Sequence, residues 1–194
     1  TPNSGQFSKT GFVFYPGGLV DPHSYVEPLS RLAVSGLGHK VIIVKMPGNL
    51  AIFDNKQGAY MFEDFPAVKK WVIGGHSLGG VMACSAIKAY PDYFVGLVLM
   101  AAYPQNNTDL SEWPGKVLSM VGEFDGIIDD GIIEAKENLL PEGTMYYTIS
   151  GGNHSFFGKY GVQKGDSEGA ISREEQTKIT VREIQKLYNE NDWD

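Results

Sequence analysis

The sequence is poor in cysteine and in positive charge, and it has no long apolar run. Cys84 is the single cysteine, so an internal disulfide or a cysteine metal cluster is excluded, and a small buried side chain is expected there. No stretch of 18 apolar residues and no secretory signal pattern occurs within the 194 residues. Lys and Arg number 16 against 23 Asp and Glu, a net charge of −7, which disfavours nucleic acid or an anionic membrane as a partner.

The remaining composition is that of an ordinary globular protein. Hydrophobic residues make up 42% and charged residues 20% of the chain. A length of 194 residues suits one domain with a sizeable core, and no internal repeat stands out. We therefore expect a single domain over residues 1–194, in which the polar residues 1–10 form a flexible lead-in.

Short apolar runs alternate with helical patterns along the whole chain. Strands are predicted at residues 11–15, 41–46, 70–74, 95–100, 116–121 and 144–149. Helices are predicted at residues 22–36, 78–90 and 129–140 and after residue 172, and residues 47–67 are predicted to form a loop with short helices. Asp21 before Pro22 and the capping box Ser172-x-x-Glu175 mark two helix starts. Continuously apolar strands in such an alternation indicate an α/β fold with a parallel sheet covered on both faces.

The stretch from residue 70 to residue 90 contains the pattern Gly75-x-Ser77-x-Gly79 between a predicted strand and a predicted helix. This context is typical of a nucleophile elbow, where a tight turn presents a serine hydroxyl at a helix N-terminus. Gly75 and Gly79 suit the turn because a Cβ would collide with the crossing strand and helix. The alternative is a glycine-rich turn with an ordinary N-capping serine.

A serine nucleophile needs a base, and the chain offers four histidines. His23 lies early in a predicted helix, His39 precedes a strand, and His76 adjoins Ser77, so its side chain is expected to point elsewhere. His154 follows the sixth predicted strand in a long polar loop, at the sheet edge where parallel sheets place their sites. His154 is therefore the predicted base.

The acid that orients this histidine is predicted to be Asp125, just past the fifth strand. Glu123 and Asp129 are rivals, although a solvated side chain and a helix N-cap are the simpler interpretations of these two. Ser77, Asp125 and His154 occur in the order Ser, Asp, His along the chain, which is the order found in α/β-hydrolases.

The chain as a whole resembles a compact α/β-hydrolase. The resemblance runs over Tyr15-Pro16-Gly17-Gly18, the Ser77 pattern, Gly122-Glu123-Phe124-Asp125 and Gly152-Asn153-His154. The segments FYPGGLVDPHSY, VKMPGNLAIF and GGNHSFFGKYGVQKGD look more narrowly like a small bacterial subgroup loosely named for dienelactone hydrolases. Dienelactone hydrolases themselves use a cysteine nucleophile, whereas the corresponding residue here is Ser77.

Relative to the wider family, this chain lacks the two leading strands and a long insertion after the fourth strand. The resemblance then implies a reduced, mostly parallel sheet of about six strands in the order 2-1-3-4-5-6, without a large lid. It also implies an oxyanion hole made by the N–H of Leu78 and that of Gly18, with Leu19 as the rival of Gly18. Residues expected to shape the substrate pocket are Leu19, Phe53, His76, Tyr103 and Phe156.

The resemblance implies a serine hydrolase of the carboxylesterase type, which cleaves small carboxylic esters through a Ser77 acyl-enzyme without a cofactor or an obligate metal. An acyltransferase, lactonase or peptidase using the same residues, and a non-catalytic hydrolase-fold binding protein, are the alternatives. No feature favours one oligomeric state. Members of the subgroup often carry an N-terminal membrane anchor. We therefore expect either the soluble part of an exported, anchored bacterial protein, which Thr1 in place of Met would fit, or a cytoplasmic protein.

Overall fold

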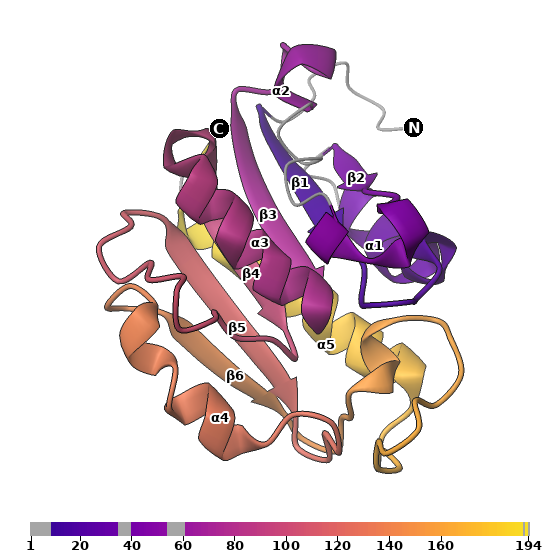
Figure 1. Ribbon diagram of the computed structural model, residues 1–194. Coiled ribbons are helices and arrows are strands. Elements are labelled where there is room, and N and C mark those ends of the chain that lie inside the picture. Colours follow the sequence, from indigo (N-terminus) through magenta and orange to yellow (C-terminus); the bar gives the residue numbers. More distant parts are fainter. Residues whose placement is uncertain (1–8, 35–39, 54–60, 192, 194) are drawn as a thin grey trace.

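A single six-stranded parallel sheet forms the centre of the protein (Figure 1). The computed structural model describes residues 9–34, 40–53, 61–191 and 193, and only the backbone of Phe53, Met61 and Asp130. The strands are β1 Thr10–Tyr15, β2 Val41–Ile43, β3 Lys70–His76, β4 Phe94–Met100, β5 Lys116–Gly122 and β6 Met145–Ile149. Their order, β2-β1-β3-β4-β5-β6, and their parallel pairing confirm the predicted sheet.

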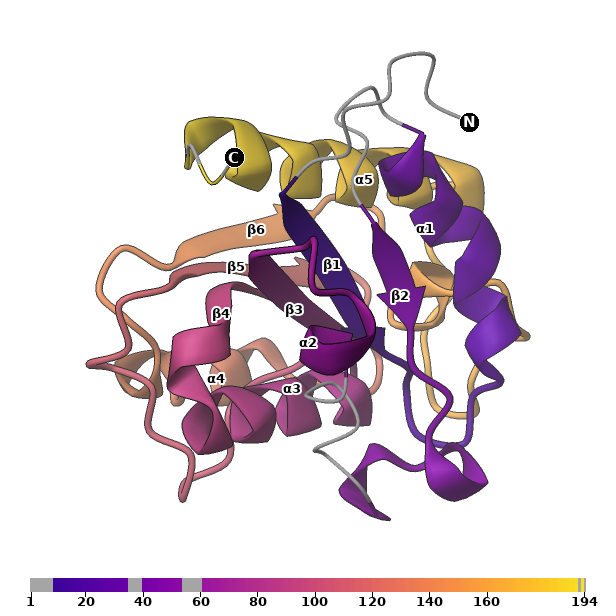
Figure 2. The same cartoon turned by 90° about the horizontal axis from the view of Figure 1, so that it is seen from above.

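Helices cover both faces of this sheet (Figure 2). Helices α1 (Val26–Ala33) and α5 (Arg173–Glu190) lie on one face, and α3 (Leu78–Ala89) lies on the other. Alternate strand residues serve the two faces: Phe12 and Phe14 pack in the cluster that contains Leu29 and Ile184, while Val13 and Tyr15 pack in the cluster that contains Ala83. Burial on both faces explains why the central strands are apolar throughout.

Short helices complete the structure, and several lie in the loops at the sheet edges. They are η1 Pro22–Tyr25, η2 Pro47–Asn49, η3 Ala51–Phe53, α2 Met61–Asp64, η5 Pro91–Tyr93, α4 Asp130–Glu134, η6 Glu137–Leu139 and η7 Ser155–Phe157. The connection from β4 to β5, residues 101–115, carries no helix in this fully described segment, so a large lid is absent there, as predicted.

The predicted helix caps are present. Asp21 Oδ1 accepts a hydrogen bond from His23 N–H before η1, and Ser172 Oγ accepts one from Glu175 N–H at the start of α5. The apolar face of α5 is buried against the sheet and comprises Val181, Ile184, Leu187 and Tyr188. Cys84 is likewise fully buried, on the sheet side of α3.

Four predicted elements differ from the structure. The strand predicted at 41–46 ends at Ile43 and is half-buried, because β2 is an edge strand that pairs with Phe12–Phe14 of β1 and has no second neighbour. The helix predicted at 129–140 is two short helices, α4 and η6. The first predicted helix begins as the 3-10 turn η1 and is α-helical from Val26 to Ala33. Thr10, predicted to belong to the lead-in, is the first residue of β1, and residues 1–8 lie outside the described chain.

Within the described residues, no helix combines the length and apolarity needed to cross a membrane. The same part of the chain contains no group of three or more His, Cys, Asp or Glu side chains arranged to hold a metal ion.

Candidate active site

Ser77 occupies a strained turn between β3 and α3. Its backbone has φ 52° and ψ −126°, a conformation that L-residues rarely adopt, and it directly precedes the first residue of α3. The turn is held on both sides, because Ser77 N–H donates to Met100 O at 2.9 Å and Ser77 O accepts from Gly80 N at 2.9 Å. The hydroxyl-bearing residue is therefore fixed at the N-terminus of a buried helix.

Glycines make this turn possible because three backbone segments cross there. A Cβ on Gly79 would lie 2.1 Å from Tyr15 O, and one on Gly75 would lie 2.4 Å from the carbonyl carbon of Gly79. No side chain fits at such distances. Helix α3 thus packs directly against the ends of β1 and β3, which brings Ser77 to the carboxyl edge of the sheet.

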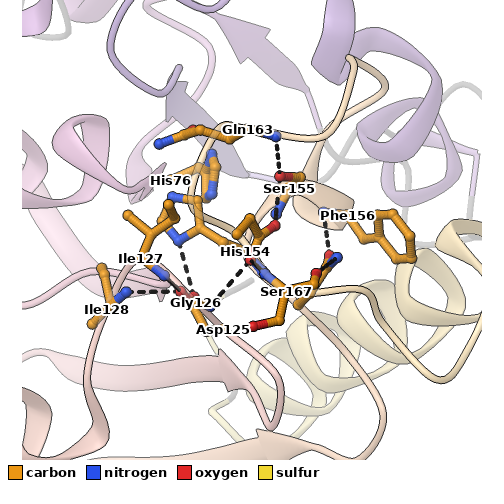
Figure 3. A network of polar contacts seen from close by, with 12 residues as sticks. His76, Asp125, Gly126, Ile127, Ile128, His154, Ser155, Phe156, Gln163 and Ser167 are labelled. Carbon is orange, nitrogen blue, oxygen red and sulfur yellow. Dashed lines mark hydrogen bonds and ion pairs between the residues drawn. The ribbon is translucent and has the colours of Figure 1, made fainter.

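His154 and Asp125 form a buried pair at the same edge (Figure 3). His154 Nδ1 lies 2.9 Å from Asp125 Oδ2, and the two side chains are 0% and 1% exposed. The other carboxylate oxygen, Asp125 Oδ1, accepts from the N–H groups of Ile127 at 2.9 Å and Ile128 at 2.8 Å. These bonds fix the carboxylate, which in turn fixes the imidazole ring.

The pairing also defines which ring nitrogen of His154 is available. Because Asp125 has no proton to give when it is ionised, Nδ1 carries the proton of the neutral ring and Nε2 carries the lone pair. His154 Nε2 is buried and has no hydrogen-bond partner within the described residues. The ring therefore has one nitrogen bonded to Asp125 and one with a free lone pair, and this second nitrogen is not hydrogen-bonded to Ser77 Oγ in the structure.

The loop that carries His154 is anchored to α5 by its neighbour Asn153. Asn153 N–H donates to Gln176 Oε1 at 3.0 Å, and Gln176 Nε2 donates back to Asn153 O at 2.8 Å. Asn153 Oδ1 also accepts from Phe156 N–H at 3.0 Å, which closes the turn of η7. Both amide side chains are fully buried, so this anchor of the loop belongs to the core.

A second buried histidine, His76, packs against the ring of His154. Its Nδ1 is 2.8 Å from Tyr25 Oη, which also accepts from Gly17 N–H at 3.1 Å. The rings of His76 and His154 lie 4.6 Å apart between centroids. Burial, and then the charge that His154 can carry, lower the pKa of His76 well below its ordinary value, so His76 is neutral. Its full burial and its bond to Tyr25 do not support the predicted contact with substrate.

The turn after β1 and the start of α3 each supply a backbone N–H group without an acceptor among the described residues. Leu19 N–H donates to Asn49 O at 2.8 Å, whereas the N–H groups of Gly18 and Leu78 have no hydrogen-bond acceptor among the described residues. Leu78 is the first residue of α3, where N–H groups have no partner within the helix. A Cβ on Gly18 would lie 3.0 Å from Leu78 Cδ2, so the two residues adjoin.

The other residues predicted to shape the pocket differ in exposure and in the direction of their side chains. Leu19 is strongly exposed with φ 61°, Tyr103 is half-buried in the loop after β4, and the side chain of Phe53 lies outside the described residues. Phe156 turns away from His154 toward α5 (Figure 3), where the Arg173 guanidinium lies 4.9 Å from its ring centroid. The prediction that Phe156 contacts substrate is therefore not supported, because this ring packs between loop and helix.

The rival acids and histidines have other contacts. Glu123 accepts from Ser150 Oγ and Gly151 N–H, both at 2.8 Å, and Asp129 caps α4 by accepting from Gly131 N–H. His23 is exposed and lies 2.7 Å from Asp21, while His39 lies outside the described residues. The sequence does not single out Tyr25 or Asp166. Tyr25 has the spacing of an apolar residue in the first predicted helix, and Asp166 is one of several carboxylates in loops.

The fold and this edge of the sheet place the chain in the hydrolase class. The family model of the alpha/beta hydrolase family matches residues 11–178, which is most of the chain. The chain belongs to the alpha/beta hydrolase family. No curated protein sequence matches it.

Solved structures share the fold at low sequence identity. A predicted CIB-like hydrolase from Thermoplasma acidophilum is 20% identical, with a TM-score of 0.67 over 96% of this chain and 89% of that one. Est1E from Butyrivibrio proteoclasticus is 11% identical, with a TM-score of 0.70 over 96% of this chain and 91% of that one. The thioesterase RedJ from Streptomyces coelicolor is 12% identical, with a TM-score of 0.66 over 93% and 86%.

Proposed function

We propose that this protein is a serine hydrolase that cleaves small carboxylic esters through an acyl-enzyme on Ser77. The observation that carries the proposal is the buried pair of His154 and Asp125, with Nδ1 held at 2.9 Å and Nε2 open. It lies at the same sheet edge as the strained turn of Ser77. His154 Nε2 has no hydrogen-bond partner among the described residues, Ser77 Oγ included, so the mechanism requires this nitrogen and the hydroxyl to meet when substrate is bound.

In the acylation step, His154 Nε2 takes the proton from Ser77 Oγ as that oxygen attacks the ester carbonyl carbon. The imidazolium so formed is stabilised by the Asp125 carboxylate, which stays ionised. Negative charge develops on the former carbonyl oxygen. His154 then gives its proton to the leaving alkoxide oxygen, so the alcohol departs neutral and the acyl group remains on Ser77.

In the deacylation step, a water molecule takes the place of the alcohol. His154 Nε2 removes a proton from this water, the hydroxide oxygen attacks the acyl carbon, and the proton returns to Ser77 Oγ when the carboxylic acid leaves. The products are one acid and one alcohol for each ester and water consumed, and the enzyme returns to its starting state.

We assign the binding of the oxyanion to the N–H groups of Leu78 and Gly18. Both are free of partners within the described chain and they adjoin, whereas the N–H of the rival Leu19 is used by Asn49 O. The N-terminus of α3 adds its dipole at this point. Removal of one such donor typically costs about 10²–10³ in kcat.

The similar structures support an ester of modest size. A structure of Est1E holds ferulic acid, a small carboxylic acid of the kind that ester cleavage releases. The connection from β4 to β5, residues 101–115, contributes no large lid, which suits a small and readily exchanged substrate.

The experiment compares hydrolysis of p-nitrophenyl acetate, butyrate and octanoate by the wild type, Ser77→Ala and Ser85→Ala. Ser85 lies on the same helix and, among the described residues, its hydroxyl donates to Val81 O, so it is the matched control. We expect the wild type and Ser85→Ala to prefer a short chain, and Ser77→Ala to lose about 10⁴-fold or more in kcat. Activity retained in Ser77→Ala would contradict the mechanism, and no turnover by a folded wild type would favour a binding protein.

A further inference from the structure

Asp166 is a loop carboxylate whose oxygens accept five hydrogen bonds. Asp166 Oδ2 accepts from Ser155 N–H at 2.8 Å and from Ser155 Oγ at 2.5 Å. Asp166 Oδ1 accepts from Gly126 N–H at 3.1 Å, Ser167 N–H at 3.0 Å and His154 N–H at 3.3 Å. So many donors around one side chain indicate an anion held in place by the backbone.

Four of these five donors, the N–H groups of Gly126, His154 and Ser155 and the Ser155 hydroxyl, adjoin the His154–Asp125 pair in sequence. Gly126 directly follows Asp125, and the donors of His154 and Ser155 lie in the turn that carries the base. The loops also approach too closely for a side chain, since a Cβ on Gly126 would lie 2.6 Å from Gly165 O. Asp166, which lies 12 residues after His154 in the same connection between β6 and α5, therefore joins this loop to the loop of Asp125.

The contact with Ser155 is itself supported from the other side. Ser155 Oγ accepts from Gln163 N–H at 2.9 Å, as Figure 3 shows, so the hydroxyl proton is left to point at Asp166 Oδ2. The segment from Gln163 to Asp166 thus holds the base turn at two points, one on the hydroxyl and one through the carboxylate.

The carboxyl group of Asp166 is ionised at neutral pH. Partial burial raises its pKa, but the hydrogen bonds from the Ser155 hydroxyl and from the N–H groups of Ser155, Gly126 and His154 outweigh burial. The net effect lowers the pKa of Asp166 below its ordinary value. Hydrogen bonds to a charged acceptor are stronger than those between neutral groups, so the clamp depends on the charge.

We propose that Asp166 is a positioning residue that holds the His154 imidazole in register with Asp125 and Ser77. The expected effect on kcat rests on the proposed function. The expected effect on the position of the His154 ring rests on the hydrogen bonds alone. Asp166 acts through the backbone of the two loops and does not contact the reacting atoms. If its charge is removed, the donors of Ser155 and Gly126 lose their best acceptor, and the 2.9 Å contact between His154 and Asp125 is no longer enforced.

The test compares Asp166→Asn with Glu168→Gln. Glu168 is an exposed carboxylate two residues further along the loop, so its amide variant removes the same charge without the same bonds. We expect Asp166→Asn to lower kcat for p-nitrophenyl butyrate, and the rate of fluorophosphonate labelling, by about 10–100-fold, as misplacement of a catalytic group does. KM should stay within about threefold, because Asp166 acts on the position of the base and not on substrate binding. Glu168→Gln should match the wild type.

A second readout does not depend on turnover. The proton on His154 Nδ1, hydrogen-bonded to a buried carboxylate, gives a downfield NMR signal that is assigned by its loss in His154→Gln. We expect this signal in the wild type and in Glu168→Gln, and its loss or broadening in Asp166→Asn. If the wild type fails to label at Ser77, the proposed function is wrong, and the signal still decides whether Asp166 positions the ring.

The proposal is overturned if Asp166→Asn matches Glu168→Gln in kcat, labelling rate and the downfield signal. A rise in KM at unchanged kcat would also overturn it. Should Asp166→Asn fail to fold, Ser155→Ala removes one bond to the carboxylate and leaves the charge in place. A folded Ser155→Ala with wild-type kcat and an unchanged signal would then reject the clamp.

Discussion

Ser77 combines a positive φ with a place directly before a buried helix. The φ of 52° costs free energy at a residue that carries a Cβ, and the turn persists because Met100 O and Gly80 N hold it from both sides. Leu19 and Ala101 also have positive φ values, of 61° and 48°, and follow β1 and β4 at the same edge. Backbone strain is therefore concentrated where the proposed chemistry takes place, as expected of a functional edge.

Asp125→Asn tests the proposed role of the acid. The amide can present its NH₂ group to His154 Nδ1, which then becomes an acceptor and leaves Nε2 protonated and unable to take the Ser77 proton. We expect kcat for short esters to fall by about 10⁴-fold with the fold retained. Steady-state kinetics and a thermal melt measure both quantities.

Asp129→Asn is the matched control for this variant, since Asp129 caps α4 through Gly131 N–H and has no contact with His154 among the described residues. Asparagine is also a good N-cap, so activity and stability should stay near the wild type. A loss of less than tenfold in Asp125→Asn would show that another group orients the base.

Among the elements, the strand order could be predicted, whereas the end of β2 and the contacts of Asp166 could not. The strand order and the caps follow from local signals: apolar runs, Asp21 before Pro22, and Ser172 three residues before Glu175. The end of β2 depends instead on how far β1 extends as its neighbour, which an apolar run from 41 to 46 does not encode. The role of Asp166 depends on a contact with Gly126, 40 residues away in sequence.

Gly79→Ala tests the packing of α3 against the ends of β1 and β3. The new Cβ would lie 2.1 Å from Tyr15 O, a backbone atom that cannot move without shifting β1. We expect a loss of about 3 kcal/mol or more in the free energy of unfolding, at the upper end of overpacking effects. In a protein of this size that corresponds to a fall of about 6–12 °C in Tm.

Gly161→Ala is the control for this substitution, because a Cβ at Gly161 meets no atom within 4 Å and its φ is not in the left-handed region. Its Tm should stay within about 2 °C of the wild type, since surface substitutions seldom exceed about 0.5 kcal/mol. Equal Tm values for the two variants in differential scanning calorimetry would contradict the close approach of α3 to β1.

For the whole molecule, stability should decline on acidification in two stages. The pKa of His76 is well below 6.5 in the folded state because the ring is buried, so below that pH the unfolded chain takes up a proton that the folded chain does not. The bonds from Gly151 N–H and the Ser150 hydroxyl lower the pKa of Glu123 below 4.5. Stability from this carboxylate is present above 4.5 and is lost as the pH falls through its lowered folded value.

Thermal melts from pH 8 to pH 3 measure this profile. We expect a constant Tm above about pH 7, a first decline below the ordinary pKa of histidine and a steeper one below that of glutamate. In Glu123→Gln, the fall in Tm below the pKa of glutamate should be smaller than in the wild type, and the fall below the pKa of histidine should be unchanged. A Tm that rises on acidification would contradict both the burial of neutral His76 and the hydrogen bonds to Glu123.

The most direct test of the central claim, that Ser77 is an activated nucleophile, is intact-protein mass spectrometry after reaction with a fluorophosphonate. The Cys84 thiol is no competing site, since burial raises its pKa to about 12. We expect one adduct for each chain, located on Ser77 by peptide mapping and absent from Ser77→Ala. A folded wild type without an adduct, or with the adduct on another residue, would contradict it.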